Sequence, residues 1–354
     1  MKRSSPIFRC LTIWTIVALS CSLLGLNAVA ANEEAPNANS QSAEKSDTAE
    51  GSDSKAEEQG DDDSTPVVGV TFSDPVTTNY QVGFHAVAVK KSATQVLVTL
   101  PVPADWPEQS VSVVDETIPT DMGNIRDREL NSGVKQLVIT VPRLRLGTKV
   151  EMLMTYQLKT SQVNPPPDTT VFQKPRVSHR EGKPYTQSSP EISFRDSKLK
   201  KQVKELVADK ATPWKEVEAI YDWVRDEIDI RSGESRDTSK VFKDRYGCVE
   251  DSVGLFVAMC RANKIPARMV WVTGKQYAEF MLVDKNKKAH WFPAMLVGPR
   301  EFGELSEPLP ILQKGDSIRV PEKKQRQKFA AEFATCKGTS KPVIKFVRKL
   351  TPVN

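Results

Sequence analysis

The chain has 354 residues, a formal net charge of +5 and five cysteines. Lysine and arginine are scattered rather than gathered in blocks, so we expect an ordinary solvated surface and no nucleic-acid partner. Three cysteines remain beyond residue 30, and no Cys/His cluster has the spacing of metal ligands. Composition therefore excludes a disulfide scaffold, and we expect neither a metal nor another cofactor.

The first 30 residues have the features of a secretory signal peptide. Three basic residues precede an apolar run over residues 10–26, and Ala28-Val29-Ala30 supplies a small-residue cleavage site. An uncleaved membrane anchor is one alternative, because the run approaches the length that spans a bilayer. Lipidation at Cys21 is another. We expect an exported protein, periplasmic or extracellular, with no stable membrane insertion once the signal is cleaved.

Residues 31–65 form an acidic segment that we expect to be a disordered linker. Its core, residues 32–64, has no aromatic residue and no aliphatic residue larger than alanine, so nothing apolar offsets the entropy of ordering the chain. Eleven acidic residues against two lysines give this core a charge of −9. Removing that −9 and the +3 of the signal from the total of +5 leaves +11 on residues 65–354, so the folded part is basic.

Residues 66–163 show the alternation of polar and apolar residues that is typical of β-strands. We expect strands over residues 81–90, 94–101, 110–115, 135–142 and 149–161. Several short strands at this spacing predict an antiparallel β-sandwich. His85 falls within one of them, where we interpret it as a packed or surface histidine rather than a ligand.

An irregular linker, residues 164–195, begins with successive prolines, which cannot extend a sheet. Helical periodicity then starts at Asp196, and a second helix begins with Thr212 as N-cap and Pro213 in its first turn. A third helix runs from Cys248 to about residue 263. Strands are expected over residues 268–273, 275–283 and 291–296. Helices followed by an antiparallel hairpin sheet predict an α+β domain over residues 196–300, behind the N-terminal sandwich.

Cys248 stands at the head of the third predicted helix. A thiol at a helix N-terminus lies in the positive end of the helix dipole, which favours the thiolate that attacks carbonyls. Cys260 lies twelve residues further along the same helix, roughly 18 Å away, which is too far for a disulfide with Cys248. For Cys260 and Cys336, a disulfide and two free thiols stay open.

Five short segments in a fixed order carry a resemblance to a known family. They are residues 219–225, Gly247-Cys248 with Asp251, residues 265–268, residues 277–279 and residues 291–293. Together they resemble the core of the transglutaminase-like superfamily, relatives of the papain-type thiol enzymes, over roughly 100 of the 354 residues. The resemblance implies acyl transfer or amide hydrolysis by a Cys-His-Asp triad. It also agrees with the sandwich, since bacterial members often carry one ahead of this domain.

Carried over residue by residue, the nucleophile position falls on Cys248. Lys275 stands where the family has its histidine, and Met295 stands where it has its aspartate. If Lys275 pairs with Met295 in the hairpin, His290 lies about 15 Å from that end of the strands, beyond reach of the thiol. Lys275 would need its pKa moved from about 10.4 to near 7 to shuttle protons. Nothing in the sequence brings His179 to the thiol.

We therefore expect an exported bacterial protein whose transglutaminase-like domain has lost catalysis. It would then act in the cell envelope as a binding or scaffolding module for peptide, polysaccharide or another envelope protein. The alternative is an active cysteine-dependent amide hydrolase or acyltransferase that uses Cys248 with a non-standard base. Residues 301–354 are expected to be a basic C-terminal extension, with a solvated helix face at residues 323–328 and an edge strand over residues 342–350.

Overall fold

The computed structural model of the chain describes residues 68–120, 122–337 and 340–353. The signal peptide expected over residues 1–30 and the acidic linker expected over residues 31–65 lie outside these ranges. Within them, no helix is both long and apolar enough to cross a membrane. All elements below belong to one unit of the chain, residues 63–354.

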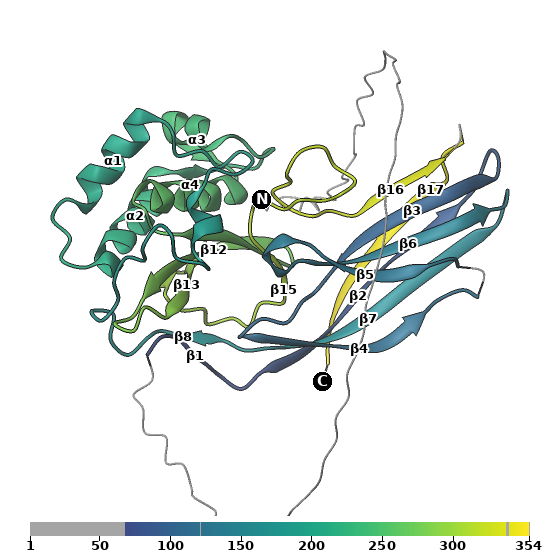
Figure 1. The fold of residues 1–354 in the computed structure, drawn as a ribbon, viewed down its shortest axis with the longest axis horizontal. Coiled ribbons are helices and arrows are strands. Elements are labelled where there is room, and N and C mark those ends of the chain that lie inside the picture. Colours follow the sequence, from purple (N-terminus) through teal and green to yellow (C-terminus); the bar gives the residue numbers. More distant parts are fainter. Residues whose placement is uncertain (1–67, 121, 338–339, 354) are drawn as a thin grey trace, which may run out of the picture. The chain divides into compact units, whose positions relative to one another are not determined.

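The sandwich consists of two antiparallel sheets, each with four strands in the part of the chain that the structure describes (Figure 1). One sheet has the order β17 (Val343–Pro352), β2 (Val76–Val87), β7 (Lys149–Thr160) and β4 (Gln109–Thr117). The other has the order β16 (Phe333–Lys337), β3 (Ala93–Val102), β6 (Lys135–Leu144) and β5 (Ile125–Glu129). Their inner faces share one core, in which Val82, Phe84, Val98, Ile139 and Met152 are fully buried.

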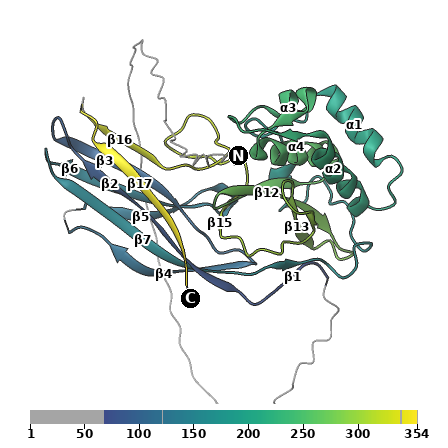
Figure 2. The same cartoon turned by 180° about the vertical axis from the view of Figure 1, so that it is seen from behind.

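Two sandwich strands come from the C-terminal end of the chain, as Figure 2 shows for β16 beside β3 and β17 beside β2. The edge strand expected over residues 342–350 is therefore confirmed. The separate basic extension expected over residues 301–354 does not form, because residues 301–302 and 311–314 are strands in the sheet of the second domain. The helix face expected at residues 323–328 is wrong, since this stretch consists of bends and irregular backbone with one isolated bridge, from Gln327 to Ile318. The C-terminal segments become strands because both domains have sheet edges that would otherwise be unpaired.

The second domain is built on an antiparallel five-stranded sheet within the described residues. Its order is β14 (Glu301–Phe302), β13 (Ala289–Met295), β12 (Lys275–Val283), β11 (Ala267–Val272) and β15 (Ile311–Lys314). Glu279 pairs with Pro293, so the expected pairing of Lys275 with Met295 is wrong by two residues. A shift by two leaves every side chain on its expected face, because strand side chains alternate.

Helices cover one face of this sheet (Figure 1). They are α1 (Ser197–Val207), α2 (Pro213–Glu227), α3 (Thr238–Asp244) and α4 (Val249–Ala262). The cap expected at Thr212 is confirmed, since its hydroxyl accepts the N–H of Lys215. The short α3 was not expected. Fully buried residues of α4, among them Phe256, pack with Phe280 and other residues of β12 in the largest core. The predicted α+β class is confirmed.

The segment 164–195 is largely irregular, with the short strand β8 (Val163–Asn164) at its start and the 3-10 turn η2 (Lys183–Thr186). Strand β8 pairs with β1 (Thr71–Phe72). The segment is nevertheless anchored to the second domain. Phe172 is buried with its ring centroid 4.8 Å from that of Phe292, and the backbone of Gln173 bonds that of Val283. Aromatic burial of this kind fixes a loop that has no ladder of its own.

A row of buried charges joins the sandwich to the sheet of the second domain. The ammonium of Lys314 lies 2.5 Å from a Glu108 oxygen and 2.6 Å from a Glu279 oxygen. The other oxygen of Glu279 accepts a 2.7 Å hydrogen bond from Arg268. Glu108 precedes β4, whereas its partners lie on β15, β12 and β11. Alternating signs make such a buried row tolerable.

Candidate functional site

Cys248 is the N-cap residue of α4, in extended backbone conformation and half-buried. It follows β10 (Tyr246–Gly247), which pairs in parallel with β9 (Asp229–Ile230). Its N–H donates to Asp251 at 2.9 Å. A Cβ atom on Gly247 would lie 2.7 Å from the Cβ of Asp251. The Gly-Cys-x-x-Asp pattern is thus a helix start, in which glycine leaves room for the aspartate that caps the helix.

Asp251 is a buried carboxylate with a structural task. Its second oxygen accepts the N–H of Arg236 at 2.8 Å and the hydroxyl of Ser235 at 3.1 Å. The carboxylate therefore ties the loop ahead of α3 to the start of α4. Hydrogen bonds to a charged acceptor are worth more than neutral ones, and here the acceptor carboxylate itself is buried.

Replacing Asp251 with alanine is expected to lower the free energy of unfolding by about 2–3 kcal/mol, because three half-buried donors lose the charged acceptor that they share. Denaturation in urea would measure this loss. The exposed carboxylate of Glu234 serves as a control, and Glu234→Ala should change stability by less than about 0.5 kcal/mol. Equal stability of Asp251→Ala and the unaltered protein would show that Asp251 does not hold the helix start.

The surroundings of Cys248 favour the protonated thiol. Burial raises the pKa of Cys248, and the nearby charges of Asp251 and Glu250 act in the same direction. The Asp251 N–H that the sulfur accepts lowers the pKa, but not enough to reverse the outcome. The thiolate expected from the helix dipole is therefore not favoured, because burial and two carboxylates outweigh the dipole. At neutral pH the group is a weak nucleophile.

Lys275 and Met295, where the sequence predicts the family's histidine and aspartate positions, have other surroundings. The ammonium of Lys275 lies 2.6 Å from a carboxylate oxygen of Glu307; the Lys275 side chain is partly exposed and that of Glu307 is exposed. Met295 is buried in a small cluster that contains Tyr277 and Ile311. Neither side chain has an interaction with Cys248 among the described contacts.

The alternation of β12 and β13 explains this arrangement. Ala278, Phe280 and Ala294 pack in the core that contains α4, whereas Tyr277 and Met295 pack in the cluster on the other face. Side chains of one strand alternate between the two faces. Lys275 is two residues from Tyr277, so it shares the face that points away from α4. The cysteine and the two positions therefore lie on opposite sides of the sheet.

The alternation places Gln276 on the α4 side instead. Its cross-strand partner is Trp271, which belongs to the α4 core. Gln276 is not among the site residues expected from the sequence. Strand periodicity could have indicated it, because residues two apart share a face: Lys275 lies on the face of Tyr277, and Gln276 lies on the opposite one. An amide can orient or bind a ligand, but it cannot take a proton from a thiol at neutral pH.

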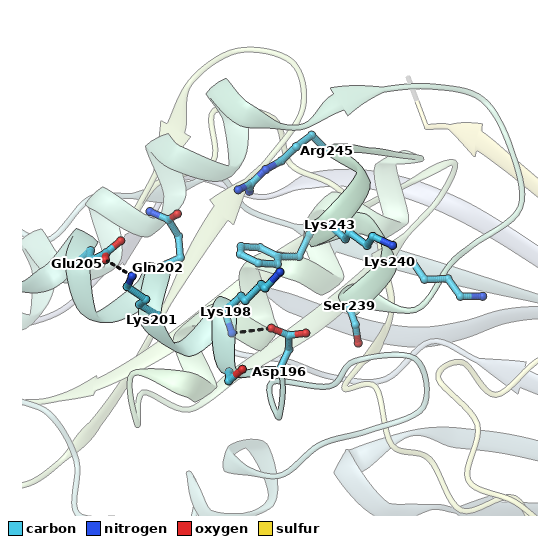
Figure 3. Close-up of a pocket in the computed structure, with 11 residues that line it drawn as sticks. Asp196, Lys198, Lys201, Gln202, Glu205, Ser239, Lys240, Lys243 and Arg245 are labelled. Atoms are coloured by element: carbon cyan, nitrogen blue, oxygen red, sulfur yellow. Dashed lines mark hydrogen bonds and ion pairs between the residues drawn. The ribbon is translucent and has the colours of Figure 1, made fainter.

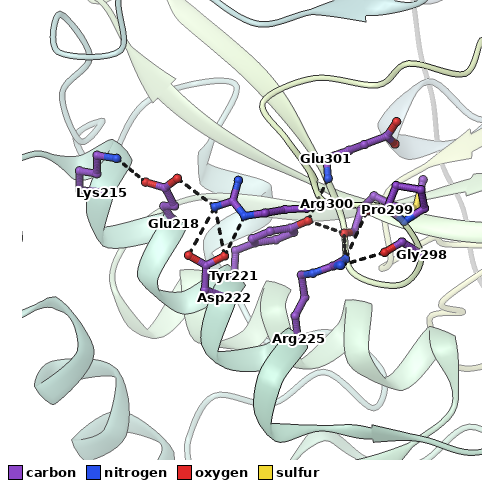
Figure 4. A network of polar contacts seen from close by, with 10 residues as sticks. Lys215, Glu218, Tyr221, Asp222, Arg225, Gly298, Pro299, Arg300 and Glu301 are labelled. Atoms are coloured by element: carbon purple, nitrogen blue, oxygen red, sulfur yellow. Dashed lines mark hydrogen bonds and ion pairs between the residues drawn. The ribbon is translucent and has the colours of Figure 1, made fainter.

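The backbone at Met295 is held from helix α2. Figure 4 shows the side chains of Tyr221 and Arg225 on this helix, with Gly298 and Arg300 of the facing segment. The hydroxyl of Tyr221 donates to the Met295 carbonyl at 2.8 Å, and a guanidinium nitrogen of Arg225 donates to the same oxygen at 3.0 Å. Arg225 also donates to the carbonyl of Gly298, and Arg300 reaches back to Asp222 on α2. The helix pattern over residues 219–225 thus anchors the end of β13.

The chain has three histidines, and the structure describes all of them. His85 lies on β2 in the sandwich, 2.8 Å from Glu151. A ring nitrogen of His179 lies 3.2 Å from the carbonyl of Lys287, and one of His290 lies 3.0 Å from Asp284. None of them has an interaction with Cys248 among the described contacts. His85 and His179 thus have surface or structural roles, and His290 forms a buried pair with Asp284.

His290 also contributes to the wall of a cavity of about 410 Å³, which is lined by Arg268, Glu279 and Lys314 as well. The charged groups of this cavity that form the buried row are already paired with one another. Cys248 is not among its lining residues. The cavity therefore has a histidine but no cysteine in its wall, and it is no substitute for the missing triad.

Lys328 lies against the start of α4. The sequence predicted it on a solvated helix face. Its ammonium is 2.5 Å from carboxylate oxygens of Glu191 and Glu250 and 2.7 Å from the hydroxyl of Ser235. Hydrogen bonds to the two carboxylates raise the pKa of Lys328 although burial opposes them. No pattern in the sequence distinguishes this lysine from its neighbours, because its partners are distant in the chain.

The thiols of Cys248, Cys260 and Cys336 are free, which decides between the two alternatives for Cys260 and Cys336. Cys260 is fully buried on α4, and burial raises its pKa far above the ordinary value. The described residues contain no group of three His, Cys, Asp or Glu side chains that is placed to hold a metal ion. The chemistry available near Cys248 is that of a protonated thiol beside paired carboxylates.

The fold defines the class: an α+β domain with a papain-like fold, in which helix α4, capped by Cys248, packs on an antiparallel sheet. Residues 200–302 match the family model described as the transglutaminase-like superfamily. The chain thus contains a transglutaminase-like domain, and the resemblance seen in the sequence is confirmed.

Solved structures add to this at the level of the fold. A crystal structure described as a putative cysteine protease from Cytophaga hutchinsonii is similar with a TM-score of 0.54 at 16% identity, covering 80% of this chain and 93% of that one. A structure described as a putative protease from Parabacteroides distasonis has 12% identity, covers 62% of this chain and 47% of that one, and has a TM-score of 0.26, which carries no weight. A search of the curated proteins returns no match.

Proposed function

We propose that the transglutaminase-like domain acts in the cell envelope as a binding or scaffolding module, and that it does not catalyse thiol chemistry. One observation supports this proposal most: the interactions of all three histidines of the chain are with partners other than Cys248. A thiol enzyme of this class needs a base within about 3 Å of the sulfur. Here the residues at the base and aspartate positions face away from α4.

The electrostatics of the thiol support the same proposal. An activated cysteine has a depressed pKa, which comes from a neighbouring cation or imidazole. The pKa of Cys248 is raised by burial, and two carboxylates add to the effect. Lys328 is a cation at this helix start, but it is held between Glu191 and Glu250. The site is thus arranged to stabilise a helix rather than a thiolate.

The rate of Cys248 alkylation by iodoacetamide tests the proposal. We expect the rate to rise only above about pH 8.5, because only the thiolate reacts and the pKa lies above its ordinary value. Cys260 and Cys336 are first replaced by serine, or the modified peptide is identified by mass spectrometry, so that the rate belongs to Cys248. A half-maximal rate below pH 7, together with release of ammonia from a glutamine peptide, would establish the alternative, an active thiol enzyme.

The variant Glu250→Gln sharpens this test. Removing that carboxylate is expected to move the alkylation profile to lower pH, since the Glu250 charge raises the thiol pKa. The variant Glu234→Gln, at an exposed position, should leave the profile unchanged. A profile that moves to higher pH in Glu250→Gln would contradict the electrostatic account of the thiol.

A further inference from the structure

A basic groove lies between helices α1 and α3 (Figure 3). We define it by five cations and two carboxylates of its walls, with a volume of about 640 Å³. The cations are Lys198, Lys201, Lys240, Lys243 and Arg245, and the carboxylates are Asp196 and Glu205. Cys248 is not among its lining residues, so the groove is separate from the helix start described above.

Both carboxylates of the groove are already engaged. One oxygen of Asp196 accepts the N–H groups of Lys198 and Leu199 at 2.8 and 3.0 Å, which caps α1. Glu205 lies 3.8 Å from Lys201 on the next turn of the same helix. Within the described residues, Lys198, Lys240 and Lys243 have no acidic partner within 4.0 Å. The groove therefore presents unbalanced positive charge from both walls.

Arg245 gives the groove a fixed cation at one end. Its guanidinium carbon lies 4.4 Å from the ring centroid of Trp223 and 4.6 Å from that of Phe242, so the side chain is stacked and has little freedom. Its Nη1 atom is buried and has no hydrogen-bond partner among the described residues. A buried donor without an acceptor costs free energy unless a ligand supplies one. This is an observation independent of the lysines.

We propose that this groove binds an acidic polysaccharide, a chain of sugars with regularly spaced carboxylates. Lysine ammonium groups are point charges that bind single carboxylates, and they sit on both walls. The groove offers no strand edge and no row of apolar anchors, which are two of the ways of binding a peptide; the polyglutamate arm of the experiment below tests the remaining one, capture of an acidic peptide by a basic cluster. It also lacks exposed aromatic faces on which bases stack, because Phe242 is buried beneath Arg245.

The proposal rests on the proposed function in one respect, since it names a ligand class for a module that binds. The two are tested separately. A reactive Cys248 would overturn the proposed function and leave the groove untouched, whereas loss of polysaccharide binding would overturn the groove and leave the thiol result standing.

The experiment is calorimetric titration of the full chain with oligogalacturonate at low salt. We expect binding that weakens as salt is added, because exposed charges are screened. The double variant Lys240→Glu/Lys243→Glu should bind at least about tenfold more weakly, since two attractive contacts become repulsive. Both lysines are exposed, so the variant is expected to melt within a few degrees of the unaltered protein.

The matched control is Lys90→Glu/Lys91→Glu, which makes the same change of charge at an exposed turn of the sandwich. This control should keep its affinity within about twofold. Equal losses in the two variants would show a diffuse effect of net charge and overturn the assignment to the groove. The assignment also fails if the unaltered protein does not bind oligogalacturonate, or if it prefers polyglutamate or inorganic phosphate of equal charge.

Discussion

Replacing Lys314 with methionine is expected to lower the free energy of unfolding by about 3–5 kcal/mol. The ammonium is 2% exposed and lies between Glu108 and Glu279, which are 7% and 5% exposed. Methionine fills a similar volume, so the loss reports charge and not packing. Glu108 would be left without its cation in a place from which water is nearly excluded. Urea denaturation of the variant measures the loss.

The double variant Lys314→Met/Glu108→Gln tests the cause. If the uncompensated Glu108 charge is responsible, this second change should restore part of the lost stability rather than add to the loss. The exposed Lys90→Met variant is the control and should change stability by less than about 0.5 kcal/mol. A loss below about 1 kcal/mol in Lys314→Met would mean that the buried row does not hold the domains together.

The same row of buried charges predicts how the stability of the fold changes with pH. Arg268 and Lys314 together outweigh burial and lower the pKa of Glu279. A carboxyl whose pKa is lower in the folded state stabilises the protein above its unfolded pKa, and the contribution is lost as pH falls toward the folded value. Without Lys314 the folded pKa of Glu279 rises. Acid unfolding of Lys314→Met should therefore begin at a higher pH than that of the unaltered protein.

A second large effect is expected for Asp316→Ala, which should also cost about 3–5 kcal/mol. Asp316 accepts hydrogen bonds from Arg261 at 2.8 and 2.9 Å, and both side chains are 1% exposed. It also accepts the N–H of Met269 at 3.2 Å. Arg261 lies near the end of α4 and also donates to the carbonyls of Ala267 and Gln187. Removing Asp316 thus leaves a buried guanidinium without its counter-charge.

Hydrogen exchange with urea denaturation would measure this effect and show where it lies. We expect the amides of β11 and the C-terminal end of α4 to lose protection first, because Arg261 joins these elements to the loop after β15. Asp222→Ala is a suitable comparison, since Asp222 bonds Arg300 with both side chains about half exposed, and this pair should contribute less than about 1 kcal/mol. Equal effects of the two variants would contradict the importance of burial.

Local patterns were sufficient for the elements that carry their own periodicity and caps. Helices α1, α2 and α4 begin where Asp196, Thr212 and Cys248 stand, and β12 covers the residues expected for it. These features depend on neighbours three or four residues away, which the sequence displays directly. The sequence also displays the family motif over residues 219–225. It does not show that Tyr221 and Arg225 of this motif donate hydrogen bonds to the Met295 carbonyl.

Such local patterns do not predict which distant segments of the chain contact one another. The short α3 has only seven residues, too few to show a clear period. Strand β16 was not expected, and β17 was expected only as an edge strand with no stated partner. Its partner β2 lies more than 250 residues earlier in the chain. Strand partners are chosen by which sheet edge is open in the folded protein, and the sequence does not state this.

The sequence by itself determined the resemblance of its helix–strand core to the transglutaminase-like superfamily, the α+β class and the helix that Cys248 begins, and it predicts that Lys275 and Met295 stand at the family's histidine and aspartate positions. Only the tertiary structure decided what surrounds those residues. It puts the two replacement positions on the sheet face away from α4, and burial with two carboxylates raises the Cys248 pKa. Residue identity and short-range spacing are local properties, whereas side-chain direction, burial and charge neighbours depend on how distant segments pack.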